Sequence, residues 1–334
     1  MVTLFKENDI RPRFLDKGLR DEIKKDVNRL LSRKKDFIRV DCPACASQKY
    51  KKIFNKFGFD FTECQQCGTV FMNPRATKEI LSDFYARSFV YKYWNKYIFP
   101  ASEKTRKKRI MKPRLKRILD LAKKYNIKKD FLIEVGPGFG TFCEAAIESG
   151  KFKRVTAIEP SANLAKTCRA KGIEVIEKTI EEIEKLDSPP SIIVSFEVIE
   201  HFFSPFEYLE SCYRLMGKES LIAVTCPNWQ GFDILTLGPK SDNVDQEHIN
   251  LFNPESLQSL FKRTGFEVLE IFTPGELDVD IVRNKVLQKK FDISGQPFIK
   301  NIILDHWEKL GVTFQEFLKT NRLSSHMWLV AIKK

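Results

Sequence analysis

The sequence contains no run of about 18 apolar residues, the length that a helix needs to cross a bilayer. Charged residues interrupt the first segment, MVTLFKENDIRPRF, where a secretory signal peptide would have its apolar stretch. The sequence also shows no internal repeat and no low-complexity segment. These absences predict a soluble, cytoplasmic protein without a membrane span.

What the sequence does contain favours a folded chain with more than one domain. Its 334 residues are enough for roughly two to three domains. Hydrophobic residues make up 43% of the chain and aromatic residues 12%, so it can bury a sizeable core, and wholesale disorder is excluded. Eight cysteines in a chain of this length do not suggest a secreted disulfide scaffold.

The net charge of +13 is unevenly distributed. Residues 1–130 hold 34 Lys and Arg against 15 Asp and Glu, whereas residues 131–334 hold 23 against 29. Residues 101–129 are the most basic, with 13 basic and two acidic side chains. Such density suits a phosphate-bearing partner, which includes a nucleic acid, a nucleotide-linked sugar and an acidic glycan. A solvated basic helix face is an equally open interpretation.

Four regions follow from the patterning of the chain. Apolar residues at helical spacing predict a helical N-terminal extension over residues 1–40. Residues 41–75 carry short β-like runs between cysteine pairs, and residues 76–125 return to helical spacing as a basic linker or lid. In residues 126–334, strand-like and helix-like segments alternate, which is typical of α/β folds.

Seven apolar runs within residues 126–334 are the predicted strands. They are Phe131–Val135, Arg154–Ile158, Ile173–Ile176, Ile192–Ser195, Leu221–Thr225, Phe266–Phe272 and Met327–Ile332. Residues 273–326 separate the last two strands and contain helical patterns. A structureless loop of that length is uncommon, so we expect a helical cap inserted between the sixth and seventh strands.

Two cysteine pairs have the spacing of a four-thiolate zinc site. Cys42 and Cys45 precede Cys64 and Cys67 in the pattern C-x2-C-x18-C-x2-C, and Gly68 gives the second turn its conformational freedom. Four thiolates leave no vacant position on zinc, so the predicted metal is structural, in a small zinc ribbon. Reduced or redox-active thiols are the alternative. The remaining cysteines lack ligand spacing and are predicted to be buried thiols: Cys143, Cys168, Cys212 and Cys226.

A glycine-rich loop follows the first predicted strand of the α/β region. Glu134 stands near the end of that strand, and the loop places Gly136, Gly138 and Gly140 at E-x-G-x-G-x-G spacing. Because position 141 is Thr, this is not the nicotinamide fingerprint G-x-G-x-x-G. The next strand ends at Glu159, where a carboxylate can accept both hydroxyls of a ribose.

Together these motifs resemble those of class I S-adenosylmethionine-dependent methyltransferases. The matching segments are Glu134-Val-Gly-Pro-Gly-Phe-Gly140, Ile158-Glu159-Pro160, Ser195-Phe-Glu-Val-Ile-Glu-His201, Asp245-Gln-Glu-His-Ile-Asn-Leu-Phe252 and Gly265-Phe266. The resemblance implies a Rossmann-like sheet of seven strands whose last strand is antiparallel. It further implies S-adenosylmethionine as cofactor, with cofactor-binding residues Glu134, Gly136, Gly138, Gly140, Glu159, Pro160, Thr179, Ile180, Phe196, Glu197 and Val198.

The four-cysteine ribbon narrows the resemblance to methyltransferases of sugars and natural products. Sugar C-methyltransferases carry a Glu-His pair where this chain has Glu247 and His248, and a Tyr where it has Asp245. The implied reaction is O- or C-methylation of a sugar or nucleotide-linked sugar, in glycan or natural-product biosynthesis. An RNA methyltransferase that uses the ribbon and the basic half for RNA binding remains the alternative. A non-catalytic zinc-ribbon interaction protein is a third class.

Methyl transfer to a hydroxyl or a carbon acid benefits from a base near neutrality, and histidine is the usual choice. Of the four histidines, His201 and His248 follow predicted strands, and α/β sites assemble at the carboxyl ends of strands. We expect His248 to act as the base with Glu247 as its orienting partner. His201 is the second candidate, either as the base or as a group that holds the acceptor.

Overall fold

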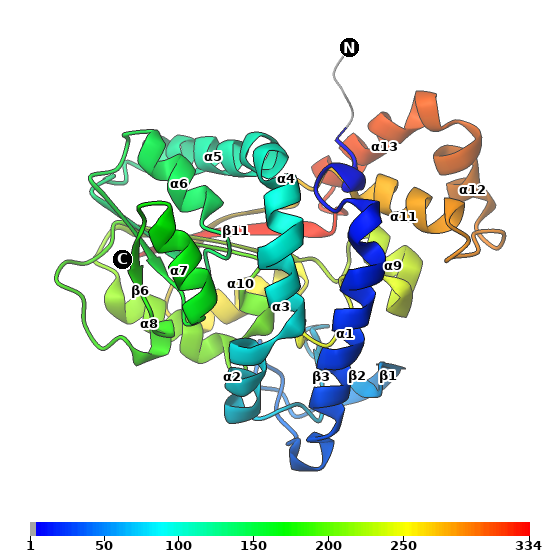
Figure 1. Cartoon of the computed structure of the whole chain (residues 1–334), viewed down its shortest axis with the longest axis horizontal. Helices are drawn as coiled ribbons and strands as arrows, with labels where there is room; N and C mark the ends of the chain where they lie inside the picture. The colour runs from blue at the N-terminus through cyan, green and yellow to red at the C-terminus, as the bar shows by residue number, and fades with distance from the viewer. Residues whose placement is uncertain (1–4) are drawn as a thin grey trace.

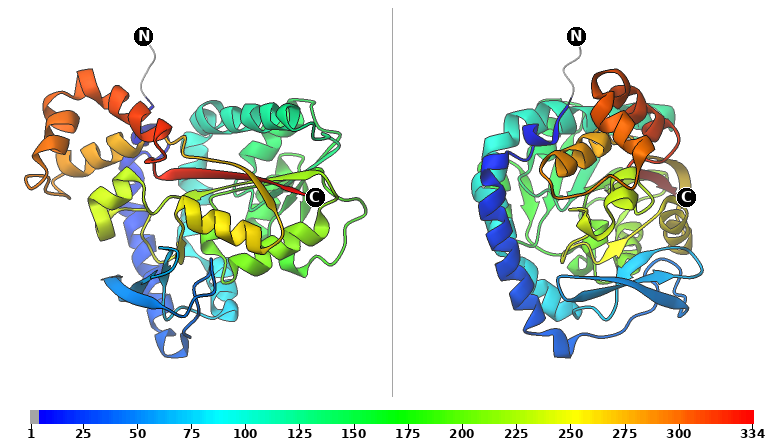
Figure 2. Two further views of the ribbon diagram at one scale, coloured as in Figure 1. Left: turned by 180° about the vertical axis from the view of Figure 1, so that it is seen from behind. Right: turned by 90° about the vertical axis from the view of Figure 1, so that its right-hand side faces the viewer.

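A seven-stranded sheet forms the centre of the computed structural model, which describes residues 5–334 (Figures 1 and 2). Its strand order is β10-β11-β8-β7-β4-β5-β6. Strands β4 to β8 are parallel, whereas β11 runs antiparallel to both of its neighbours. The strands are β4 (Phe131–Val135), β5 (Arg154–Ile158), β6 (Glu174–Ile176), β7 (Ile192–Phe196), β8 (Ser220–Pro227), β10 (Glu267–Phe272) and β11 (His326–Lys333).

This sheet confirms the predicted α/β class and the antiparallel last strand. The predicted boundaries differ from the observed ones by at most two residues, because the central strands are buried on both faces and form uninterrupted apolar runs. Each crossover between the parallel strands contains a helix, as parallel pairing requires.

Helices cover both faces of the sheet. On one face, α8 (Pro205–Leu215) and α10 (Pro254–Arg263) pack against β7, β8 and β11. On the other face, α5 (Lys112–Lys124), α6 (Thr141–Glu148) and α7 (Ala162–Ala170) supply the apolar contacts. The helix α5 illustrates the sequence logic, since its buried residues repeat at helical spacing: Leu115, Ile118, Leu121 and Ala122.

The segment that carries the four cysteines forms most of a second, four-stranded antiparallel sheet, with Cys64 at the end of β2 and the other three cysteines outside the strands. Strands β1 (Tyr50–Lys56), β2 (Phe59–Cys64) and β3 (Val70–Met72) come from the predicted ribbon. The fourth strand, β9 (Asn250–Leu251), comes from the far end of the α/β region and pairs with β3. Sequence reasoning did not find this strand, because two residues carry no periodicity. The ribbon sheet is therefore completed by residues about 180 positions away.

A buried arginine further joins the ribbon to the α/β region. Arg75 is fully buried and donates from Nη1 to Asn250 Oδ1 at 3.0 Å and to the carbonyl of Phe203 at 3.1 Å. Phe71 and Phe252 belong to the same apolar core as residues of β4, β7 and β8. The two sheets consequently share one core instead of forming separate ones.

A row of helices stands beside the carboxyl ends of the parallel strands. The N-terminal helix α1 (Asp16–Leu31) lies alongside α3 (Phe89–Tyr93), as Figures 1 and 2 show. Asp26 of α1 is buried and accepts hydrogen bonds from Ser88 Oγ at 2.8 Å and from the N–H of Val90 at 2.9 Å. Asp26 thereby provides an acceptor for a backbone N–H group in the first turn of α3, which has no partner within that helix. These hydrogen bonds hold the two helices together. The first four residues of the predicted N-terminal extension lie outside the described residues.

The basic segment is almost continuously helical, with two π-helical turns. It runs through α2 (Lys78–Arg87), α3, η4 (Trp94–Ile98), α4 (Phe99–Arg106), η5 (Lys107–Met111) and α5. Each π-helical turn is followed by a proline near the start of the next helix, Pro100 in α4 and Pro113 in α5. Proline cannot donate the usual helical hydrogen bond, and a widened turn accommodates that loss.

Between β10 and β11 the chain forms a group of helices at one end of the molecule. They are α11 (Asp278–Leu287), α12 (Pro297–Lys300), η9 (Asn301–Asp305) and α13 (Trp307–Thr320), and they share an apolar cluster with α9 (Phe232–Leu237). The N-terminal segment reaches across to α11. The N–H of Glu7 donates to Asp280 Oδ2 at 2.9 Å, and Arg13 Nη2 donates to Asn284 Oδ1 at 2.7 Å.

Within residues 5–334, no helix is both long enough and apolar enough to span a bilayer.

The shared core predicts that the ribbon and the α/β region unfold together. Phe71 is fully buried between them, so Phe71→Ala should lower the free energy of unfolding by about 3–5 kcal/mol and keep a single transition. Denaturant unfolding followed by circular dichroism measures both. Phe57, in the turn between β1 and β2 of the same sheet, is 45% exposed, and Phe57→Ala is the matched control, with a change within about 0.5 kcal/mol. A separate early transition in Phe71→Ala would contradict the shared core.

Candidate functional site

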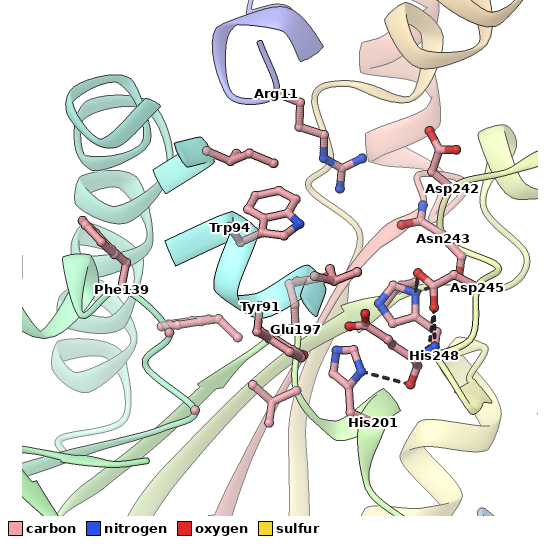
Figure 3. Close-up of a pocket in the computed structure, with 18 of the residues that line it drawn as sticks. Arg11, Tyr91, Trp94, Phe139, Glu197, His201, Asp242, Asn243, Asp245 and His248 are labelled. Atoms are coloured by element: carbon pink, nitrogen blue, oxygen red, sulfur yellow. Dashed lines mark hydrogen bonds and ion pairs between the residues drawn. The ribbon is translucent and has the colours of Figure 1, made fainter. Parts of the chain in front are cut away.

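A large cavity lies between the carboxyl ends of the parallel strands and the row of helices beside them (Figure 3). Its volume is about 1590 Å³, more than the roughly 300–1,000 Å³ of a site for one small molecule. The loops after β4, β5 and β7 line one side, and residues of α1, α3 and α4 line the other. The cavity is therefore large enough for two ligands side by side.

The glycine loop turns tightly at the edge of this cavity. Gly136, Gly138 and Gly140 all adopt positive φ angles, of 69°, 55° and 73°. A Cβ at position 136 would lie 2.7 Å from Val198, so only glycine fits there. Gly136 and Gly138 line the cavity, whereas Gly140 is not among its lining residues and instead packs closely against Ile173. The backbone of the loop can thus approach a ligand closely.

Two buried carboxyl groups flank the loop. Burial raises the pKa of Glu134 to about 7, opposed by a hydrogen bond from Cys143 Sγ to Glu134 Oε2 at 3.0 Å. Burial likewise raises the pKa of Glu159 to about 7, opposed by a hydrogen bond from the N–H of Ser161 at 2.8 Å. Both residues line the cavity, so each offers a carboxylate that a ligand can reach.

The other predicted cofactor-binding residues also reach the cavity. Pro160 follows Glu159, and Thr179 caps the short 3₁₀ helix η6 (Ile180–Glu182), whose first residue is buried. On the facing side, Phe196 ends β7, and Glu197 and Val198 follow it. The predicted set, with the exception of Gly140, therefore forms one continuous wall.

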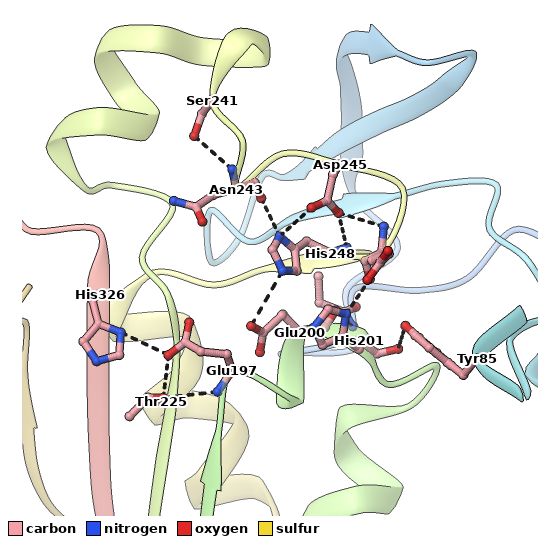
Figure 4. Close-up of polar contacts among 12 residues, drawn as sticks. Tyr85, Glu197, Glu200, His201, Thr225, Ser241, Asn243, Asp245, His248 and His326 are labelled. Atoms are coloured by element: carbon pink, nitrogen blue, oxygen red, sulfur yellow. Dashed lines mark hydrogen bonds and ion pairs between the residues drawn. The ribbon is translucent and has the colours of Figure 1, made fainter. Parts of the chain in front are cut away.

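Glu197 is held in a strained conformation by a polar network (Figure 4). Its φ angle is 58°, which is uncommon for a residue with a side chain. Its Oε1 accepts from Thr225 Oγ1 at 2.6 Å and lies 3.0 Å from His326 Nδ1 and 3.5 Å from Arg114 Nη2. Burial opposes ionisation, but His326 and Arg114 hold the pKa of this carboxyl below its usual range.

The two predicted catalytic histidines lie side by side. Their ring centroids are 4.8 Å apart, and both residues line the cavity. His201 Nδ1 lies 3.0 Å from the carbonyl oxygen of Glu247, and His248 Nδ1 lies 2.9 Å from that of Asn243. A carbonyl can only accept, so in both rings Nδ1 carries the proton and Nε2 is left with its lone pair. Burial and the neighbouring ring lower the pKa of His201 to about 4.

The orienting partner of His248 is Asp245, not the predicted Glu247. Asp245 Oδ2 lies 3.3 Å from His248 Nδ1, while its Oδ1 accepts from the N–H groups of Glu247 and His248 at 2.7 and 2.8 Å. The side chain of Asp245 closes a turn through these hydrogen bonds. In this turn the side chains of Glu247 and His248 point in different directions. The Glu247 side chain instead accepts from Gln246 at 3.0 Å, and burial and Asp245 raise its pKa.

Glu200 lies behind the histidines and is completely buried (Figure 4). It belongs to the 3₁₀ turn η7 (Ile199–His201), and its Oε1 is 4.0 Å from His248 Nε2. Neither of its carboxyl oxygens has a hydrogen-bond partner among residues 5–334. Burial and the charge of Glu197 raise its pKa well above the usual range.

Asn250 fixes the relative position of the two histidines. Its Nδ2 donates to the carbonyls of Glu200 at 3.2 Å and Phe202 at 2.8 Å, on either side of His201. Its Oδ1 accepts from Arg75, and its backbone belongs to β9, two residues after His248. One buried amide therefore connects the loop of His248, the turn of His201 and the ribbon sheet.

The four cysteines of the ribbon form a cluster next to the start of α10. Their sulfur atoms lie within 4.8 Å of one another, with Cys42 and Cys67 at 3.5 Å and Cys45 and Cys64 at 3.6 Å. Four thiolates about 2.3 Å from one zinc ion stand about 3.8 Å apart, so the cluster fits that ion. The hydrogen bond from Asn253 Nδ2 to the carbonyl of Cys67, at 2.9 Å, ties it to the start of α10.

Sequence reasoning gave no site role to four residues that the structure places here: Asn243, Glu200, Arg114 and His326. Glu200 carried a signal, since it belongs to the segment of residues 195–201, which begins at the end of β7, and directly precedes His201. Arg114 could not be distinguished within a segment that is basic throughout. The contacts of Asn243 and His326 depend on tertiary structure that sequence spacing does not reveal.

Comparison with known proteins gives a family match and distant relatives. A family model described as a methyltransferase domain matches residues 105–271, which is half of the chain. A probable S-adenosylmethionine-dependent methyltransferase of Mycobacterium tuberculosis is 25% identical over 134 residues, covering 39% of this chain and 46% of that protein. The C-methyltransferase NovU of Streptomyces niveus is 25% identical over 149 residues, covering 43% and 34%. The chain spans less than half the length of these curated relatives.

Among solved structures, an S-adenosylmethionine-dependent methyltransferase from Archaeoglobus fulgidus resembles this chain with a TM-score of 0.47 and 22% identity. The alignment covers 71% of this chain and the whole of that one.

Proposed function

Because the chain belongs to the methyltransferase domain family, we propose that it transfers the methyl group of S-adenosylmethionine to a sugar or a nucleotide-linked sugar. In this proposal the methyl group leaves the sulfonium sulfur, a bond forms to an oxygen or carbon of the acceptor, and the acceptor loses a proton. The products are the methylated acceptor, S-adenosylhomocysteine and that proton. Such a reaction belongs to glycan or natural-product biosynthesis.

The observation that carries the proposal is the glycine loop with Glu159 at the next strand end, both facing one cavity. The loop backbone would lie along the methionine part of the cofactor, near Glu134 and Gly136. The carboxylate of Glu159 would accept the two ribose hydroxyls. Adenine would lie between Pro160 and the turn at Thr179 and Ile180. Residues Phe196 to Val198 would face the methyl group.

The part of the cavity that such a cofactor leaves free suits a polyhydroxyl acceptor. Asp242 and Asn243 line it near the histidines, and carboxylate and amide groups bind sugar hydroxyls by hydrogen bonds (Figure 3). Arg11 and Lys56 also line the cavity and provide positive charge for a phosphate group, whereas Lys285, another lining residue, is paired with Asp242 at 2.6 Å. The partial similarity to a C-methyltransferase keeps carbon as well as oxygen open as the methylated atom.

The basic segment itself favours a small acceptor over a nucleic acid. Several of its cations form ion pairs within the chain, among them Lys107 with Glu144 and Lys124 with Glu270. Arg114 is turned inward towards Glu197. These cations are therefore less available to a phosphate backbone than the composition suggests.

We assign activation of the acceptor to Nε2 of His248. The backbone carbonyl at Nδ1 and the carboxylate of Asp245 hold the ring in the tautomer whose Nε2 lone pair is available. That lone pair either takes the proton of the acceptor directly or holds a cation that acidifies the acceptor. His201, beside it, helps to hold the acceptor, and Glu247 positions His201 through its carbonyl.

We also propose that Cys42, Cys45, Cys64 and Cys67 hold one structural zinc ion. The purified protein should contain about one zinc per chain by elemental analysis. Cys64→Ser should lose the metal and unfold at lower temperature, because structural zinc contributes about 10 kcal/mol or more to small domains. Cys212→Ala, at a buried thiol outside the cluster, should retain the zinc. A fully stable metal-free protein would contradict this assignment.

The cofactor assignment predicts a pH dependence of binding. Glu159 has a pKa of about 7 because it is buried, and only its ionised form accepts both ribose hydroxyls. Lowering the pH through 7 therefore protonates it and weakens binding of S-adenosylhomocysteine, measured by calorimetry between pH 5.5 and 7.5. Glu159→Gln should weaken binding at pH 7.5 by about 10- to 150-fold, which corresponds to about 1.5–3 kcal/mol. The slope of the logarithm of the binding affinity of this variant against pH should be smaller by one proton than that of the parent protein. Equal affinity and slope would show that Glu159 is misassigned.

The assignment of His248 predicts that His248→Ala lowers kcat by about 10²–10⁴ and leaves S-adenosylhomocysteine binding intact. Turnover is measured against a panel of nucleotide-linked sugars. His201→Ala should have a milder effect, mainly on KM. His306→Ala, in the helices between β10 and β11, is the control histidine variant. Near-normal turnover of His248→Ala together with an inactive His201→Ala would reverse the two roles.

A further inference from the structure

We propose that Glu200, His201 and His248 form a second metal site, which binds one divalent transition-metal ion at the wall of the cavity. Their ligand atoms lie within 4.8 Å of one another, and the three residues come from two segments that Asn250 fixes together. Two imidazoles and one carboxylate bind on one side of an ion and leave its other coordination positions open to further ligands. This site is distinct from the cysteine cluster.

The first argument is the orientation of the two imidazoles. Metal-binding histidines usually donate their other ring N–H to a carbonyl or a carboxylate, which fixes the tautomer. Both rings do so here. His201 Nδ1 faces the carbonyl of Glu247 at 3.0 Å, and His248 Nδ1 faces the carbonyl of Asn243 at 2.9 Å and Asp245 Oδ2 at 3.3 Å. The two Nε2 lone pairs are therefore the ones available to an ion.

The second argument is the unpartnered carboxyl group of Glu200. It is completely buried, and neither of its oxygens is hydrogen-bonded within residues 5–334. A buried carboxyl group without a partner is costly, and a bound cation is the partner that would remove this cost. Glu200 points at His248, with Oε1 4.0 Å from Nε2, as the dashed line in Figure 4 shows.

The present separations require a small adjustment. Ligand atoms at about 2.0–2.2 Å from one ion stand about 3–3.5 Å apart, so Glu200 and His248 must approach by about 0.5–1 Å. Glu197 and Asp245 add negative charge around the site, while Arg114 and His326 are engaged with Glu197. The charges around the site therefore suit a dication.

The metal site would add a step to the proposed function. The role of the ion rests on that proposed function, whereas the binding of the ion does not. Both histidines line the cavity, whereas Glu200 does not, so the open positions of the ion face the acceptor. Two neighbouring oxygens of a sugar can occupy them. A hydroxyl bound to a dication is more acidic, so its proton passes to solvent water and its oxygen attacks the methyl group. His248 would then act by holding the ion.

The test uses Mn²⁺ on the full, zinc-loaded chain, because thiolate sites prefer softer ions. Calorimetry and electron paramagnetic resonance should find about one Mn²⁺ per chain with nitrogen ligands. Glu200→Gln and His248→Gln should each weaken Mn²⁺ binding by at least about tenfold. Replacing even a residue that only hydrogen-bonds to a metal ligand lowers metal affinity by that factor. Glu210→Gln, on the exposed side of α8, and His306→Gln are matched controls and should bind Mn²⁺ normally. If Glu200→Gln fails to fold, His248→Gln decides.

Binding lost in both cluster variants and kept in both controls would establish the site. No Mn²⁺ binding to the parent protein, or equal binding by His248→Gln, would overturn it. Methyl transfer that persists after chelator treatment would also overturn the role of the ion and leave the proposed function intact, with His248 as the direct base. Conversely, tight Mn²⁺ binding without turnover on any sugar would refute the proposed acceptor while the metal site stands.

Discussion

One buried side chain, the amide of Asn250, connects the parts on which the site depends. Its Nδ2 fixes the turn that carries Glu200 and His201, and its Oδ1 accepts from Arg75 of the ribbon segment. Its own backbone pairs with β3, two residues after His248. An amide has both donors and an acceptor, so it can satisfy all these groups at once, which a carboxylate or an aliphatic side chain cannot. The ribbon sheet thereby helps to support the part of the cavity wall that carries His201 and His248.

The sequence predicts the sheet well because its central strands are buried and therefore consist mainly of apolar residues. The central strands are buried on both faces, so runs such as Phe131–Val135 and Ile192–Phe196 stand out from the polar segments around them. The wall formed by Glu134, Gly136 and Glu159 was also predictable, because each lies at a fixed offset from a strand end. What could not be predicted depends on tertiary contacts. Strand β9 has two residues, and the pairing of His248 with Asp245 depends on the path of an irregular loop.

The part of the cavity wall around the glycine loop and the two histidines is acidic, although the chain as a whole is basic and Arg11 and Lys56 line other parts of the cavity. Glu134, Glu159, Glu197 and Glu247 all contribute carboxyl groups, and Glu200 lies directly behind them. Excess basic residues lie mainly on the helices outside, where several pair with surface acids. A cavity of this kind favours ligands that carry positive charge, because Coulomb interactions are stronger away from water. The sulfonium and ammonium groups of S-adenosylmethionine match that preference.

The contacts between the N-terminal segment and α11 bear on how the chain folds. Glu7 and Arg13 bind Asp280 and Asn284, more than 270 residues later, so two segments far apart in the sequence meet at the wall of the cavity. Contacts of such long separation form late, because the loop they close is long. On a ribosome, Glu7 and Arg13 would emerge early, whereas their partners on α11 would emerge only after nearly the entire α/β region. This part of the cavity wall can therefore form only after α11 has been made, and a chain truncated before α11 would lack it.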